Sequence, residues 1–512
     1  MVHRGKLSAA CGPCRSRRLK CDQKKPFCSQ CIRAKRECSG YRDVTAGRFY
    51  DQTEEVTKKN SSSSSSPSAP ASASSSPSPS HPQKRRCESS TSTSLVRQQV
   101  SVPISDQGTA FMLSRYLSRD SLDQARGPVA TLLPYLINSP SGRAVTASMN
   151  AVGLAALSNI HQSSQLMLTA RREYVSALTE TNAALSDPVQ STSNASLIAV
   201  TFLGMFELMT CNGPPLMEKY LKHIEGCAKL LQLRGSRQLE DSVGLGLFTQ
   251  FRQTIILGNL WYKKSTPSWL VELSHEARAY RSDDSTEDEL FLLMARVGDL
   301  CADLNNAIEP VRFVKKALKL DAEFSAWAMF VEPHRRYTTV AVPESNDEGS
   351  GFSPYQHIYG KRYHIYPDTV VSSWWSDYRI IRLMLLELIC WFCDHLSRKD
   401  EATSSQYRQT ITHSTAIARQ LTEDICASVP YHMGVTEECP YEDWNSTRTG
   451  GILRLIWPLF IATDCVGATP QIVDWIANTL FKIGHVVGVQ QALVMSNMLR
   501  SGRQLTWMPE LD

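Results

Sequence analysis

The sequence lacks the long apolar runs that a membrane-spanning helix needs. A span takes about 20 consecutive apolar residues, and the most apolar stretches are interrupted by Glu207, Arg382 and Glu387. No positively charged segment followed by an apolar one precedes Cys11, so we find no secretion signal. We therefore expect no membrane contact and a reducing compartment, in which cysteines stay as thiols.

Recognisable catalytic motifs are missing as well. The chain has no G-x-x-x-x-G-K-[ST] phosphate loop, no H-E-x-x-H helix and no G-x-S-x-G nucleophile turn. Gly244 and Gly246 lack the third glycine of the G-x-G-x-x-G dinucleotide motif. We expect that the protein is not an enzyme, and the alternative is an enzyme in residues 108–512 that carries an accessory N-terminal segment.

Charge is distributed unevenly along the chain. The 512 residues are 42% hydrophobic and 21% charged, which is enough for a sizeable core and more than one domain. Residues 1–50 hold thirteen lysines and arginines against three acidic residues, a net charge of +10. The whole chain carries +5, so the remainder carries about −5. This asymmetry predicts that only the N-terminal end meets a polyanion.

Six of the fifteen cysteines lie in two halves that share the spacing C-x2-C-x6-C. A segment this short cannot bury a core, whereas thiolates bound to zinc can hold it together. Six ligands cannot fill two separate four-ligand sites. Two zinc ions can share them if one cysteine of each half bridges both metals, and Cys11 and Cys28 are the equivalent candidates. The predicted metal ligands are Cys11, Cys14, Cys21, Cys28, Cys31 and Cys38.

The cysteine spacing and its flanks resemble the fungal six-cysteine binuclear zinc cluster domain. The flanking residues that carry the resemblance are Arg15, Arg17, Arg18, Lys20, Asp22 and Pro26. The resemblance implies two Zn²⁺ ions shared by six thiolates, with Cys11 and Cys28 as bridging ligands. It also implies that the helix after Cys14 enters the major groove of double-stranded DNA and reads a CGG triplet.

The same resemblance assigns the basic residues that follow Cys14. Arg17 and Arg18 would contact bases, since arginine can bind guanine through two hydrogen bonds, while Arg15 and Lys20 would contact phosphates. The expected protein is a DNA-binding transcription regulator of RNA polymerase II promoters, located in the nucleus and in contact with the transcription machinery. A basic face that is merely solvated is the alternative.

Other chemistry is possible for the cysteines. A disulfide framework would need an oxidising compartment, and a zinc store would need no basic helix between its ligands. Cys390 and Cys393 form another C-x2-C, but they lie in an apolar run without a second pair. We interpret these two as core thiols rather than metal ligands or a redox pair.

The chain divides into three parts by composition. Residues 1–50 form the cluster domain, and residues 51–107 form a Ser/Pro-rich linker that cannot bury enough surface to order itself. Within the linker, Lys84, Arg85 and Arg86 are either part of a nuclear-import signal or a solvated charge run. Residues 108–512 form an all-helical regulatory domain, so the predicted fold class is mainly α.

Several local signals support the helical prediction. Asp187 and Pro188 should end one helix, residues 197–209 are apolar enough for a buried helix, and Gly235 should end the next. Residues 149–235 and the segment YHIYPD, with Trp374 to Arg382 after it, resemble the helical domain that follows this zinc cluster. We expect a loop over residues 333–371, whose aromatic side chains either pack on the body or line a ligand pocket.

Two further expectations concern partners. Residues 41–60 show no sustained heptad repeat, so dimerisation would have to use residues 108–512. The alternative is a monomer with extra contacts from its basic flanks. A regulatory domain that senses a small metabolite is a second functional alternative, compatible with DNA binding.

Overall fold

The computed structural model describes residues 10–17, 19–24, 27–36, 38, 103–116, 142–213, 218–281, 285–305, 309–342, 358–399, 401–437, 439, 442 and 449–502. The chain forms two compact units, Met1–Arg97 and Gln98–Asp512. Most of the predicted Ser/Pro linker, with the basic run at residues 84–86, lies outside the described residues.

The first unit contains two one-turn helices, one in each cysteine half. They are α1 (Gly12–Ser16) and α2 (Ser29–Arg33). The buried side chains here are almost all cysteines, so apolar packing contributes little to the stability of this unit.

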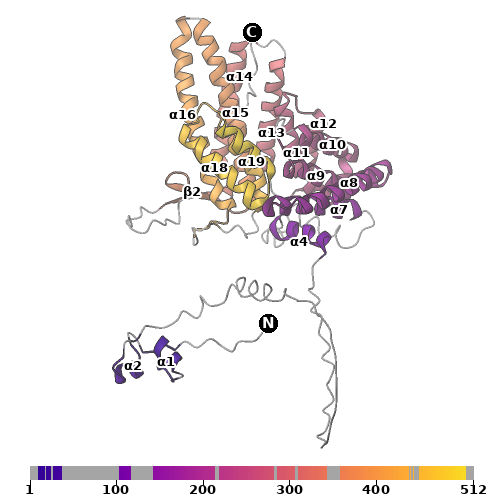
Figure 1. The fold of residues 1–512 in the computed structure, drawn as a ribbon. Coiled ribbons are helices and arrows are strands. Elements are labelled where there is room, and N and C mark those ends of the chain that lie inside the picture. The colour runs from indigo at the N-terminus through magenta and orange to yellow at the C-terminus, as the bar shows by residue number, and fades with distance from the viewer. Residues whose placement is uncertain are drawn as a thin grey trace, which may run out of the picture. The chain divides into compact units, whose positions relative to one another are not determined.

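The second unit is helical, which confirms the mainly α prediction (Figure 1). Its first described helix starts at Ile104, four residues before the expected boundary at residue 108. The helices are α4 (Ile104–Tyr116), α7 (Gly142–His161), α8 (Ser164–Ser186), α9 (Asn194–Met209), α10 (Glu218–Arg234), α11 (Ser242–Trp261), α12 (Ser268–Ala277), α13 (Ser285–Ala302), α14 (Pro310–Phe330), α15 (Thr369–Lys399), α16 (Glu401–His432), α17 (Thr449–Ala462), α18 (Pro470–Val487) and α19 (Gln490–Arg500).

Local capping explains where several of these helices begin and end. Ser193 caps α9 by accepting a hydrogen bond from the backbone N–H of Ser196, and Asp241 caps α11 in the same way. As predicted, α8 ends just before Asp187 and α10 ends before Gly235, which has a φ of 56°. The buried helix predicted over residues 197–209 is α9.

α15 is largely buried between neighbouring helices. Nearly every residue from Val371 to Cys393 is buried, and the helix packs against both α14 and α16 (Figure 1). Arg382 on α15 pairs with Asp321 on α14 at 2.6 Å, and its guanidinium also donates to the Tyr378 hydroxyl. Cys390 and Cys393 are buried free thiols on this helix.

The prediction of a loop over residues 333–371 is wrong in part, because the segment contains a β-hairpin. Strands β1 (Thr338–Ala341) and β2 (Arg362–Ile365) pair antiparallel, with Thr338 opposite Ile365. Two four-residue strands give too little alternation to be detected from sequence. Tyr363 in β2 is buried, so packing on the body accounts for this aromatic side chain.

The hairpin is fixed to α15 by a buried arginine. Arg379 is 1% exposed, and its guanidinium donates to the Tyr366 hydroxyl at 2.7 Å and lies 4.9 Å from the centre of the Tyr337 ring. Burial and the charge of Arg379 lower the pKa of His364 to about 2. His364 is therefore neutral, and the segment YHIYPD meets the stretch from Trp374 to Arg382 here.

α7 connects the beginning of the second unit with its end. It crosses α4 where Gly108 and Gly153 meet, so closely that a Cβ atom on Gly153 would lie 2.0 Å from the Gly108 carbonyl oxygen. Asn159 at the other end donates from Nδ2 to the carbonyl oxygens of Met209 and Gly488, both at 2.7 Å. These contacts join three distant parts of the sequence.

Candidate metal centre and nucleic-acid interface

The structure brings the six predicted ligand cysteines together. Five of them are buried and Cys21 is partly buried. The Sγ atom of Cys11 lies 3.6 Å from that of Cys28 and 3.7 Å from that of Cys31, and Cys14 lies 3.7 Å from Cys28. A disulfide needs about 2.05 Å, so these contacts are between free thiols. Two sulfurs that ligate one zinc at about 2.3 Å would lie about 3.8 Å apart in a tetrahedron.

The thiols fall into two groups of four, and each group could hold one metal ion. In each group the Sγ atoms all lie within 4.8 Å of one another. Cys11 and Cys28 belong to both groups, as the bridging arrangement requires. The groups are Cys11, Cys14, Cys21 and Cys28, and Cys11, Cys28, Cys31 and Cys38. An all-thiol set of four suits a closed zinc site and leaves no position open for a substrate.

The two halves repeat one another in backbone structure as well as in sequence. Leu19 N–H donates to the carbonyl of Cys14, and Arg36 N–H donates to that of Cys31, both at 2.9 Å. Each bond closes the chain after the one-turn helix of its half. Lys35, just before Arg36, has a φ of 51°, a left-handed conformation that costs energy for a residue with a Cβ atom.

Asp22 links the two halves and was not recognised as a positioning residue from the sequence. Its Oδ1 atom accepts a hydrogen bond from Ser29 N–H at 3.0 Å, at the start of α2. Hydrogen bonding to Ser29, first through its side chain and then through this N–H, lowers the pKa of Asp22. Cys28 caps the same helix, because its Sγ accepts from the N–H of Cys31 at 3.3 Å. The signal available in sequence was an acid placed directly after a ligand cysteine.

Close packing of the thiols changes their acidity. Burial raises the pKa of Cys14, and the contact with Cys28 together with burial raises that of Cys31 to about 12. Backbone hydrogen bonds lower the pKa of Cys21. Since a thiol ligates zinc as the thiolate, binding must release protons, and acid should weaken it.

The predicted DNA-contacting residues follow Cys14 directly. Arg17 and Lys20 are exposed, and Arg15 lies in α1. The side chain of Arg15 and the whole of Arg18 lie outside the described residues, as does Pro26. The exposed members of the set are therefore available to a partner molecule.

The equivalent positions of the second half carry different chemistry. A shift of 17 residues superposes the cysteines and places Ile32, Ala34, Lys35 and Glu37 where the first half has its four basic residues. Ile32 is 62% exposed. The second half has its own exposed cations, Arg33, Lys35 and Arg36, so the two halves share a backbone but place their cations at different positions relative to the cysteines.

Comparison with known families decides the classification. Residues 123–495 match the family described as the fungal specific transcription factor domain, which is more than half of the chain. The chain belongs to this family. Residues 9–47 match the fungal Zn(2)-Cys(6) binuclear cluster domain. The cofactor of this fungal transcription factor is accordingly a pair of zinc ions, and the six-thiol arrangement fits it.

Similar proteins match over short stretches of the chain. White-opaque regulator 2 of Candida albicans is 51% identical over 35 residues, 7% of this chain and 8% of that protein. An uncharacterized transcriptional regulatory protein of Schizosaccharomyces pombe is 50% identical over 38 residues, 7% of each chain. Transcription factor dbaG of Emericella nidulans is 29% identical over 146 residues, 26% of this chain and 32% of that protein. The match thus spans a third or less of each of these relatives. No solved structure matches.

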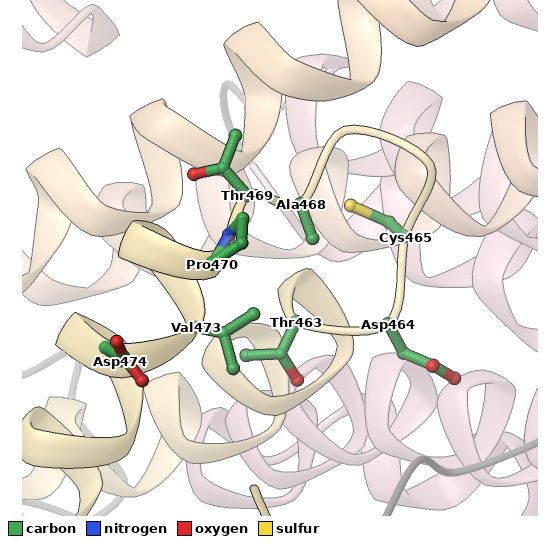
Figure 2. A pocket seen from close by; sticks show the side chains of 8 residues that line it. All are labelled: Thr463, Asp464, Cys465, Ala468, Thr469, Pro470, Val473 and Asp474. Atoms are coloured by element: carbon green, nitrogen blue, oxygen red, sulfur yellow. The ribbon is translucent and has the colours of Figure 1, made fainter. Parts of the chain in front are cut away.

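The helical unit has a hollow between α17 and α18 that we considered as a ligand site. It has a volume of about 380 Å³ and includes Thr463, Cys465 and Thr469 (Figure 2). The Thr463 hydroxyl donates to a backbone carbonyl, Cys465 does the same, and Thr469 caps α18. These three groups already have partners within the protein, so they do not mark a ligand site. Across the described residues, we find no helix with the length and apolar character to cross a membrane.

Proposed function

We propose that this protein is a zinc-dependent, sequence-specific DNA-binding regulator of RNA polymerase II transcription that acts in the nucleus. The observation that carries the proposal is the pair of four-thiol groups that share Cys11 and Cys28, next to exposed cations that include Arg17 and Lys20. The family membership of both units supports it. We expect contact with the transcription machinery and assign no catalytic step to the chain.

The role of each residue follows from its position. Cys11 and Cys28 would bridge the two zinc ions, with Cys14 and Cys21 completing one site and Cys31 and Cys38 the other. Bound zinc supplies the cross-links that replace a hydrophobic core. Six thiolates and two dications leave a charge of −2, which the nearby arginines and lysines more than offset.

Recognition of DNA would divide between base and phosphate contacts. Arg17 and Arg18 would donate to guanine O6 and N7 in a CGG-type triplet, which is worth about 1–3 kcal/mol of discrimination per contact. Arg15 and Lys20 would bind phosphates and set the orientation of α1. The exposure of Arg17 and Lys20 supports these assignments.

One triplet carries too little information for a specific site, so we propose that two copies act together. Three base pairs recur by chance throughout any genome. Self-association through residues 108–512 would pair two cluster domains and let the protein bind paired CGG-type triplets.

Selection from a pool of random duplexes tests the proposed function. The full-length, zinc-loaded protein should enrich CGG-type triplets, in pairs. Recovery of sequences without any enriched triplet would contradict sequence-specific binding.

A further inference from the structure

The first half of α14 exposes a row of four cations. Arg312, Lys315, Lys316 and Lys319 are all exposed, and residues 310–320 contain no acidic side chain. We call these four residues the α14 cation row. Their spacing of three and four residues places them on one face of the helix.

The opposite face of α14 is fixed in the core. Phe313 stacks on Phe392 of α15 with ring centres 4.2 Å apart, and Val314 and Ala317 are buried. The α14 cation row therefore faces away from α15, and rotation of the helix cannot bury it.

The row is unfavourable for the helix that carries it. The positive end of the helix dipole is at the N-terminus, where cations are disfavoured. Arg312 and Lys316 are four residues apart, as are Lys315 and Lys319, and like charges at this spacing repel one another. Of the four, Arg312 lies in the first turn, where the dipole acts, and repulsion between the like-charged pairs adds to this cost, so helix stability does not account for the row.

Neighbouring acids offset little of this charge. Glu309 caps the helix by accepting from Val311 and Arg312 N–H, and Glu323 pairs with Arg296. In the described part of the chain, Lys316 is the row member with a carboxylate within 4 Å, that of Asp303 at 3.2 Å. Glu323 also interacts electrostatically with Lys319, and the row itself carries a formal charge of +4.

We propose that the α14 cation row binds phosphates of the DNA duplex to which the cluster domain is bound. The inference rests on the proposed function and adds a second contact to it. A duplex carries one negative charge per about 1.7 Å of axis, and the row extends about 10 Å along α14. Because both units belong to one chain, binding by the first raises the local concentration of DNA for the second.

The composition of the face favours DNA over an acidic protein. Protein interfaces are enriched in aromatic side chains and depleted of lysine at their centres. Three of the four row members are lysines, and Leu318, 39% exposed, is the large apolar side chain beside them among the described residues. A face made mostly of lysines, with one partly exposed leucine beside them, is suited to sequence-independent phosphate contacts.

The test uses the full-length zinc-loaded protein and a long duplex that contains its preferred triplets. The variant combines Arg312→Gln, Lys315→Gln, Lys316→Gln and Lys319→Gln. The measurement is the slope of log Kd against log salt concentration. We expect the slope to fall by about 2–4, because each lost phosphate contact removes roughly 0.9, with triplet preference unchanged. A duplex trimmed to the triplets should bind both proteins with the same slope.

A matched control removes equal charge elsewhere. Lys219, Lys222, Lys229 and Lys264 are exposed on α10 and after α11, and three of them pair with acids. Their replacement by glutamine should leave the slope unchanged. An unchanged slope in the α14 variant, an equal fall in the control, or a loss confined to binding of an acidic peptide would overturn the inference. Wild-type protein without triplet preference would instead contradict the proposed function.

Discussion

The Sγ atoms of Cys11 and Cys28 lie 3.6 Å apart although 17 residues separate them in sequence. They are the first cysteines of the two halves and the two thiols common to both metal-binding groups. The two halves of the cluster domain therefore come together at the pair of thiols that would bridge two zinc ions.

Removal of one base-reading arginine should weaken binding to the preferred triplet more than binding to random DNA. Arg18→Ala should cost about 1–3 kcal/mol on the preferred triplet and flatten the preference among triplets. Lys20→Ala should weaken binding to all sequences alike and reduce the salt slope by about one. Equal losses on preferred and scrambled duplexes for Arg18→Ala would reassign Arg18 to a phosphate contact.

Gly153→Ala should loosen the contact between α4 and α7. The added Cβ would lie 2.0 Å from the Gly108 carbonyl oxygen, and such overpacking costs about 1–3 kcal/mol. The matched control is Gly246→Ala on α11, where nothing lies within 4 Å of the new Cβ. That change should stabilise the helix by up to about 1 kcal/mol. A thermal unfolding curve in which both variants shift in the same direction would contradict the close packing.

The buried carboxyl of Asp377 should make the helical unit less stable as the pH rises. Burial raises its pKa to about 7, although Arg454 opposes the shift, and Oδ2 has no hydrogen-bond partner among the described residues. Between about pH 4 and 7 the folded state holds a proton that the unfolded state has lost, so stability falls through this range. Above pH 7 both states are ionised and this contribution stays constant.

Asp377→Asn removes that penalty. Its Tm should exceed that of the wild type by a few degrees at pH 8 and match it near pH 4. The control is Asp394→Asn, because Asp394 is 51% exposed and pairs with Arg398 at the surface. If the difference between Asp377→Asn and wild type did not change with pH, the carboxyl would be ionised in the folded protein.

Full-length protein should be a dimer through residues 108–512. It should bind paired CGG-type triplets over several spacings, whereas residues 1–50 should bind one triplet weakly. Sedimentation of the full chain together with binding to duplexes of varied half-site spacing measures this. A monomeric helical domain, combined with undiminished affinity of residues 1–50, would contradict it.

The sequence predicts the metal chemistry and the fold class for physical reasons. Zinc ligation depends on ligand type and local spacing, and the cysteine pattern shows both. The ends of α8 and α10 were predictable because Asp187 with Pro188 and Gly235 act through local backbone preferences. The mainly α class followed from apolar periodicity.

Local spacing and backbone preferences could not predict contacts between residues that are distant in sequence. The β1–β2 hairpin joins strands separated by twenty residues, and the helix propensity of Arg379 gives no sign that its guanidinium is enclosed by aromatic rings. Asn159 reaches Gly488 across most of the chain. Such contacts depend on tertiary packing, which leaves no local signature in composition or periodicity.

Zinc removal tests the central claim most directly. Full-length protein should contain two zinc ions and prefer CGG-type duplexes, and chelation or Cys21→Ser should unfold residues 1–50 and abolish DNA binding while the helical circular dichroism persists. Restored zinc should restore binding to the chelated wild type. The account predicts that DNA affinity and zinc content fall together; a protein that loses its zinc by elemental analysis and keeps its DNA affinity would contradict it.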